Sequence, residues 1–123
     1  MLEPQGIAHV GVSASNLSEL GSFYQHKVGL RLIEGSASAL HFDIGGGAIL
    51  EIWPNGSASA TRKDPSAQSV RVCIRVQHLE STIAKLASQG IQPHGQIGEY
   101  GGTRWIHYTD PEGNGFGFVA SSS

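Results

Sequence analysis

Two stretches of this 123-residue chain carry side chains that could bind a metal or move a proton, and their spacing is the same. His41 stands ten positions before Glu51, and His107 stands ten positions before Gly117. An imidazole beside a carboxylate can hold a divalent metal or transfer a proton to and from a substrate. The first stretch therefore has the residues for such chemistry, whereas glycine leaves the second without its carboxylate.

The same repetition extends to the segments that precede these stretches. Residues 7–12 and 70–76 are both rich in alternating apolar residues, and each is followed by a helical pattern and a glycine. Self-similarity of this kind indicates a duplicated structural unit. His9 in the first copy corresponds to Arg71 in the second, and arginine stays protonated and has no lone pair for a metal. The two copies thus differ at the positions where chemistry is expected.

Each copy is predicted to form a β-α-β-β-β module. Period-two alternation predicts strands, and Leu and aromatic residues at helical spacing predict one helix in each copy. Asn16 or Ser15 can cap the first helix, and Gly29 can end it. A glycine-rich segment, 96–102, is expected to be a flexible loop. The predicted strands are 6–13, 30–34, 39–44, 48–53, 70–76, 91–94, 103–109 and 115–120.

We expect one domain, residues 1–123, built from the pseudo-repeats 6–53 and 69–120. The segment between them, 54–68, is rich in Ser, Ala, Gly and Pro and is predicted to be a mobile linker. A module of about sixty residues is marginally stable alone. The two modules are therefore expected to fold together or to pair with a second chain.

Strand alternation also predicts which side chains face one another. If the first hairpin turns near Gly46, His41 lies opposite Glu51, and by the same logic His107 lies opposite Gly117. The apolar face of each leading strand should lie under a helix, so the other face is left to line a cavity. The residues predicted to line this cavity are His9, His41, Glu51, Trp53, Arg71, Cys73, Trp105 and His107.

Composition excludes several classes of function. The net charge is −2 and no run of basic residues is present, so nucleic-acid binding has no electrostatic support. No run of eighteen apolar residues and no basic leader followed by an apolar stretch is present, so neither a membrane span nor a signal peptide is expected. A lone cysteine fits a reducing compartment, and a cytoplasmic location is expected.

A further motif, Asp110-Pro111-Glu112-Gly113-Asn114, precedes the last predicted strand. With two β-α-β-β-β copies, a His on the first strand and a Glu on the fourth, it makes the chain resemble the vicinal oxygen chelate superfamily. That superfamily includes glyoxalase I, bleomycin-resistance proteins and extradiol dioxygenases. The resemblance covers residues 6–119 and implies an α+β fold whose curled mixed sheets surround a shared cavity, within one chain or across a homodimer.

The resemblance also assigns metal-ligand positions, one on the first and one on the last strand of each module. In this sequence they are His9, Glu51, Arg71 and Gly117. Two ligands fall short of the three usual for catalytic zinc, so no cofactor is expected. A divalent metal, if bound, would have His9 and Glu51 as its ligands, with an imidazole from one of the hairpins as a third.

Three residues keep two interpretations each. Arg71 could hold a carboxylate or phosphate of a ligand in a forked contact, or it could neutralise Glu51. Trp53 and Trp105 could stack on a planar ligand, or they could be core or dimer-contact residues.

Two classes of function follow from these residues. The first is a metal-free protein that binds a small organic ligand, anionic or aromatic, as drug-sequestering members of the superfamily do. The second is a lyase, isomerase or epimerase that acts on a carbonyl compound. Glu51 would then be the catalytic base, and a weakly held metal or Arg71 would stabilise the oxyanion. The ligand-binding residues in the first case are His9, Arg71, His41, Trp53, Trp105 and His107.

Overall fold

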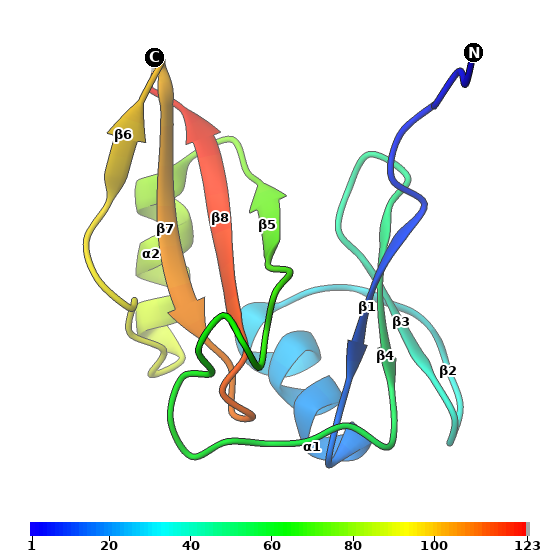
Figure 1. The fold of residues 1–123 in the computed structure, drawn as a ribbon. Coiled ribbons are helices and arrows are strands. Elements are labelled where there is room, and N and C mark those ends of the chain that lie inside the picture. The colour runs from blue at the N-terminus through cyan, green and yellow to red at the C-terminus, as the bar shows by residue number, and fades with distance from the viewer. Residues whose placement is uncertain (123) are drawn as a thin grey trace.

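The chain folds into two four-stranded mixed sheets with helices packed against them, which confirms the predicted α+β class (Figure 1). The computed structural model describes residues 1–122, so the last residue of the predicted domain lies outside the described part. In chain order the elements are β1 (His9–Ser13), α1 (Leu17–Ser22), the π-helix η1 (Phe23–Val28), β2 (Leu32–Gly35), β3 (Leu40–Asp43), β4 (Ile49–Trp53), β5 (Val72–Arg75), α2 (Leu79–Ser88), β6 (Gly98–Tyr100), β7 (Thr103–Thr109) and β8 (Gly115–Ser121).

The two sheets have the same topology. Sheet A has the strand order β1-β4-β3-β2, and sheet B has the order β5-β8-β7-β6. In each sheet the first and last strands of the module are parallel neighbours, and the other pairs are antiparallel. β1 and β5 are therefore outer strands, and the two sheets do not close into one barrel.

The first helix begins and ends where the sequence predicts. The Asn16 side chain accepts a hydrogen bond from the backbone N–H of Glu19, which satisfies one free donor of the first turn. After Ser22 the helix widens into η1, which ends at Gly29 with φ of 90°. A left-handed residue at this place favours glycine because it has no Cβ.

Both hairpin registers agree with the prediction. His41 pairs with Glu51 across β3 and β4, and His107 pairs with Gly117 across β7 and β8. The first hairpin turns through residues 45–47, three glycines that all have positive φ. The alternation of apolar residues is thus sufficient to set which side chains share a face.

The second strand of the second module lies later in the chain than predicted. Residues 91–94 form no strand, because the Ile91 N–H bonds back to Leu86 in α2 and Pro93 has no N–H to donate. One ladder-like bond remains, from the His94 N–H to the His107 carbonyl oxygen, at 2.7 Å. The strand that takes this place in the module is β6, which lies inside the segment 96–102 that was expected to be a flexible loop.

The hydrophobic core continues from one module into the other. Figure 1 shows α1 lying between the two sheets, and the aromatic side chains of η1 pack on β8. The ring centroids of Phe23 and Phe116 are 6.0 Å apart, and those of Tyr24 and Phe116 are 5.4 Å apart. The Tyr108 ring stacks on Phe116 at a centroid distance of 5.7 Å.

Two buried carboxylates join the modules at the same place. Glu112 accepts hydrogen bonds from the backbone N–H groups of Ser15 and Asn16, each 2.8 Å long. Asp110 accepts a 2.9 Å hydrogen bond from the Tyr24 hydroxyl. The loop before β8 therefore holds the start of the first helix, a role that its turn-like sequence does not reveal.

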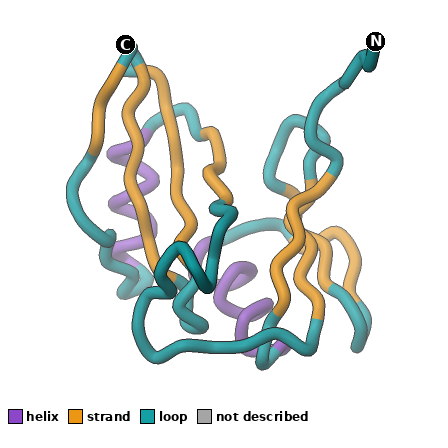
Figure 2. The backbone as a smooth tube through the Cα atoms, viewed as in Figure 1, coloured by secondary structure: helices purple, strands orange, loops and turns teal. Residues whose placement is uncertain are grey.

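The segment 54–68 is a loop along one end of both sheets (Figure 2), but it is tied to the second module. The Ser59 N–H donates to the Glu112 carbonyl oxygen, and the Lys63 N–H donates to that of Gly113. Gln68 exchanges two side-chain hydrogen bonds with the backbone of Gly115. These bonds differ from the expectation of a mobile linker, since each fixes the loop against residues 112–115.

Candidate functional site

Three side chains meet on the open face of sheet A, the face away from α1. Glu51 lies between two imidazoles: His41 Nε2 contacts Glu51 Oε2, and His9 Nε2 lies 3.9 Å from Glu51 Oε1. The three residues come from the adjacent strands β3, β4 and β1. The Glu51 side chain is only 17% exposed, so most of its contact is with the protein. A carboxylate paired with imidazole can accept a proton from a bound molecule and pass it on.

Trp53 lies on the same face, at the end of β4. Its ring covers Gly11 of β1, where a Cβ atom would overlap the indole. The ring of His9 meets Trp53 edge-on at a centroid distance of 6.2 Å. Trp53 stays 36% exposed, so its outer face is available to a ligand or to a partner chain.

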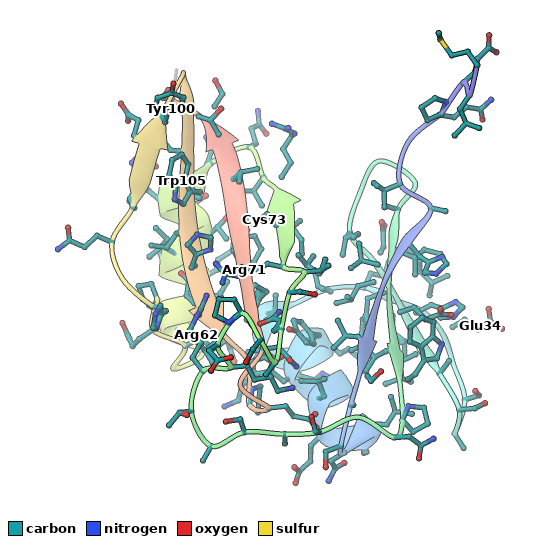
Figure 3. The ribbon with its side chains drawn as sticks, in the orientation of Figure 1. Glu34, Arg62, Arg71, Cys73, Tyr100 and Trp105 are labelled. Atoms are coloured by element: carbon teal, nitrogen blue, oxygen red, sulfur yellow. The ribbon has the colours of Figure 1, made fainter. Side chains whose placement is uncertain are left out.

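A second group occupies the open face of sheet B and contains Arg71, Cys73, Trp105 and His107 (Figure 3). Cys73 and His107 stand on either side of Gly117. A Cβ atom at Gly117 would lie 3.5 Å from Cys73 Sγ, 3.0 Å from His107 Nδ1 and 2.7 Å from the Ile106 carbonyl oxygen. No side chain fits at Gly117 without displacing backbone.

Burial and positive charge shift two pKa values in this group. Burial lowers the pKa of His107 below its ordinary 6.5, and the positive charges of Arg71, Arg62 and His94 lower it further. His107 Nδ1 is buried and has no hydrogen-bond partner among residues 1–122. Partial burial of the Cys73 thiol also raises its pKa, against a smaller opposite effect of Arg71. These shifts favour the neutral imidazole of His107 and the protonated thiol of Cys73 over the reactive thiolate.

Trp105 packs within its own sheet. Its ring covers Gly98 of β6, where a Cβ atom would overlap the indole. Trp105 is half-buried by this contact. The two tryptophans thus occupy similar places in the two modules, each over a glycine of the neighbouring strand.

The structure does not bring the two groups into one cavity within a single chain. Glu51 pairs with His41 and His9, and within residues 1–122 it forms no ion pair with Arg71. The interpretation of Arg71 as the neutralising partner of Glu51 is therefore wrong for the single chain. The hollow between β1 and β5 has a volume of about 290 Å³, and it is lined by Val10, Arg71 and Cys73 among others.

One cationic residue of this region was not predicted from the sequence. Arg62, in the loop 54–68, donates through Nη1 to the Tyr108 carbonyl oxygen at 2.8 Å and to Thr109 Oγ1 at 2.7 Å. It reaches the same end of sheet B as Arg71. Its segment has the composition of a linker, and no local pattern indicates that this arginine would lie beside Arg71.

Two modules of this topology, with their ligand-type residues on the open faces, define an α+β protein of the glyoxalase type. The model of the Glyoxalase/Bleomycin resistance protein/Dioxygenase superfamily matches residues 6–118, and the chain belongs to this superfamily. Among curated protein sequences, none matches this chain significantly. Within the described residues, no helix has the length and apolar character needed to cross a bilayer.

Solved structures share the fold at low sequence identity. A putative glyoxalase family protein from Bacillus anthracis is 19% identical, with 98% of each chain covered and a TM-score of 0.78. TnmS3, an antibiotic binding protein from Streptomyces sp. CB03234, is 19% identical, with 99% of this chain and 100% of that chain covered and a TM-score of 0.76. Lactoylglutathione lyase from Agrobacterium tumefaciens is 14% identical, with 96% and 95% covered and a TM-score of 0.74.

The four-ligand metal site that the resemblance implies does not fit these residues. Of its positions, Arg71 offers no lone pair, and Gly117 has its side-chain space closed by Ile106 and His107. In residues 1–122, no group of three or more His, Cys, Asp or Glu side chains is placed to hold a metal ion. Glu51 Oε2 is paired with His41 Nε2.

Proposed function

We propose that this protein binds a small organic ligand, anionic or aromatic, on the open faces of its sheets and without a metal. One observation carries the proposal. In the second module the two metal-ligand positions are occupied by Arg71 and by Gly117, which has no room for a side chain. Arg71 offers forked hydrogen bonds to an anionic group, and the exposed face of Trp53 offers a stacking surface. The antibiotic binding protein TnmS3, with the same fold, supports binding as a role for such a scaffold.

Fluorescence titration tests this proposal. A panel of planar and anionic compounds is titrated into the protein, and a bound ligand is expected to change tryptophan emission saturably. Trp53→Phe should remove most of the signal, whereas Trp105→Phe, which replaces a ring packed on Gly98, should remove less. A panel that never changes the emission, or a ligand that the protein consumes, would contradict simple binding.

A homodimer would complete the site, and we include it in the proposal. The described residues expose 7644 Å², whereas a folded monomer of 13.0 kDa exposes about 6,300 Å². The outer strands β1 and β5 have free edges that can pair with another chain. Ile7 and Val70, which precede these two strands, are 66% and 71% exposed. Pairing of these edges between two copies would bring an open face of sheet A beside one of sheet B.

Sedimentation equilibrium tests the dimer. The wild-type protein is expected to have twice the mass of the chain at micromolar concentration. Val70→Glu places a charge two residues before β5 and is expected to shift the protein toward the monomer, whereas Leu2→Glu, at another exposed apolar residue, should leave the mass unchanged. A wild-type protein that sediments as a monomer would rule out a site shared between copies.

A second candidate function is a lyase, isomerase or epimerase acting on a carbonyl compound. The observation that favours it is the pairing of Glu51 with His41, which holds a carboxylate ready to accept a proton. The neighbour lactoylglutathione lyase has the same fold. Glu51→Gln separates the two functions. If the protein is an enzyme, the variant lacks the catalytic base and its turnover falls; if the protein only binds a ligand, the variant still binds it. Unchanged turnover in this variant would exclude Glu51 as the base.

We also expect the protein to act in the cytoplasm. Cys73 is free and exposed, and a reducing compartment keeps such a thiol reduced. Fractionation of the native host, with detection of the protein in the cytosolic fraction, tests this expectation.

A further inference from the structure

We propose that Arg62 and Arg71 together form a binding site for one oxyanion group of the ligand, a carboxylate or a phosphate. The inference rests on the proposed binding function and names the chemical class that the site selects. It also adds a specificity residue, Arg62, from the loop between the modules.

The two guanidinium groups converge on Gly115, the first residue of β8. Arg62 Nη2 lies 2.6 Å, and Arg71 Nε lies 3.1 Å, from the point that a Cβ atom of Gly115 would occupy. The two nitrogens therefore lie within roughly 6 Å of each other, a separation at which like charges repel strongly. Since residue 115 is glycine, it has no side chain that would separate the two guanidinium groups.

Among the residues that the structure describes, no carboxylate forms an ion pair with either arginine. Within residues 1–122, the ion pairs involve His9, His41, Arg31 and Arg104, and neither Arg62 nor Arg71 takes part in one. The acidic residues of the adjoining loop are engaged elsewhere: Asp110 with the Tyr24 hydroxyl, and Glu112 with the N–H groups at the start of the first helix. A bound oxyanion would replace the repulsion between the arginines by two attractions.

The geometry leaves donors free for that oxyanion. Arg62 is held in place through Nη1 by Tyr108 and Thr109, so Nη2 points to the Gly115 face in a fixed position. Arg71 makes no hydrogen bond or ion pair with any described residue, and its side chain can turn both terminal nitrogens toward a ligand. One arginine is thus pre-positioned and the other can close on the ligand, which suits forked recognition of carboxylate or phosphate oxygens.

His107 gives the site a second readout. Its pKa is lowered by burial and by the positive charges of Arg71, Arg62 and His94, and Cys73 is the other titratable group beside it. An oxyanion between the arginines cancels part of that positive charge. The pKa of His107 should therefore rise when the anion binds, and an NMR titration of the imidazole can follow this change.

The experiment is calorimetric titration with inorganic phosphate, phenylphosphonate and benzoate. Arg71→Met is expected to weaken binding of the favoured probe at least about tenfold, because charge-assisted hydrogen bonds are lost. Arg75→Met is the matched control: it removes the same charge from a position four residues further along the chain, in β5, and it should change affinity less than about twofold, since exposed charges are screened. Arg62→Lys keeps the charge but not the fork and should fall between them.

Tighter binding of phenylphosphonate than of benzoate would identify a phosphate-type ligand, and the reverse order would identify a carboxylate. Equal losses in Arg71→Met and Arg75→Met would overturn the inference, because they would show only general attraction by positive charge. Absence of both heat and a shift in the His107 pKa with all three probes would overturn it as well. If an organic compound then still bound with its tryptophan signal intact, the proposed function would stand without the arginine site. If the arginines bound an anion but no organic compound changed the tryptophan emission, the arginine site would stand and the proposed function would fail.

Discussion

Glu112 is expected to contribute more to stability than any exposed carboxylate of the chain. It is 5% exposed, and its two oxygens accept 2.8 Å hydrogen bonds from the N–H groups of Ser15 and Asn16, 97 and 96 positions away. We predict that Glu112→Gln, which is nearly isosteric, weakens this junction between the modules. The amide keeps one acceptor oxygen, but its NH₂ group faces the second N–H, so a buried donor is left without a partner.

The magnitude follows from the number of bonds. A hydrogen bond to a charged group contributes about 1.5–3 kcal/mol, so loss of one bond and of the charge should lower the free energy of unfolding by about 2–3 kcal/mol. A chain of 123 residues changes its Tm by about 4 °C per kcal/mol. The expected fall in Tm is therefore about 8–12 °C, measured by thermal unfolding at one fixed protein concentration.

Glu99→Gln is the matched control. Glu99 is exposed and lies 3.7 Å from Arg104 in a surface pair, so its replacement should change the free energy of unfolding by at most about 0.5 kcal/mol. Equal Tm values for Glu112→Gln and Glu99→Gln would refute the role of Glu112 as the tie between modules. Unshifted backbone amide signals of Ser15 and Asn16 in the Glu112 variant would refute it independently.

Three other predictions concern the same molecule. Tyr24→Phe removes the hydroxyl that donates to Asp110, and urea unfolding should show a loss of about 1–2 kcal/mol; no loss would mean that this bond contributes nothing. The pKa of His107 in the folded protein lies below 6.5, so His107 binds a proton more readily in the unfolded chain. The free energy of unfolding should therefore fall as pH drops below 6.5, and His107→Asn should make that fall smaller. An NMR pKa of His107 at or above 6.5 would contradict this prediction. Gly117→Ala places a Cβ 2.7 Å from the Ile106 carbonyl oxygen and should cost about 1–3 kcal/mol by thermal unfolding, whereas an unchanged Tm would show that the space is not closed.

The sequence predicts what depends on local alternation. Opposition of His41 to Glu51 and of His107 to Gly117 follows from strand periodicity and the place of each turn, and both pairs are found. The cap at Asn16 is local as well and is confirmed. The sequence does not predict the position of β6. The Ile91 N–H donates to the Leu86 carbonyl oxygen at the end of α2, so the residues that were expected to form the strand follow the helix instead.

What the sequence leaves out depends on contacts between the modules. The role of Glu112 requires the start of the first helix to lie beside the last loop, and nothing in a turn-like motif indicates this. In the same way Arg62 lies beside Arg71 only because Arg62 is bonded to Tyr108 and Thr109. The sequence predicts that Glu51 and Arg71 line one cavity, but the structure places them on separate sheets. The pattern within each module does not determine how the two modules are placed relative to each other.

Metal analysis of the freshly purified protein tests the central claim most directly. The protein is prepared without chelators from cells supplied in turn with zinc, iron, nickel and manganese, and its metal content is measured per chain. With Arg71 and Gly117 in two ligand positions and Glu51 paired with His41, we expect far less than one ion per chain in every preparation. A stoichiometric metal that is lost in both His9→Ala and Glu51→Ala would contradict the claim that this protein binds its ligand without a metal centre.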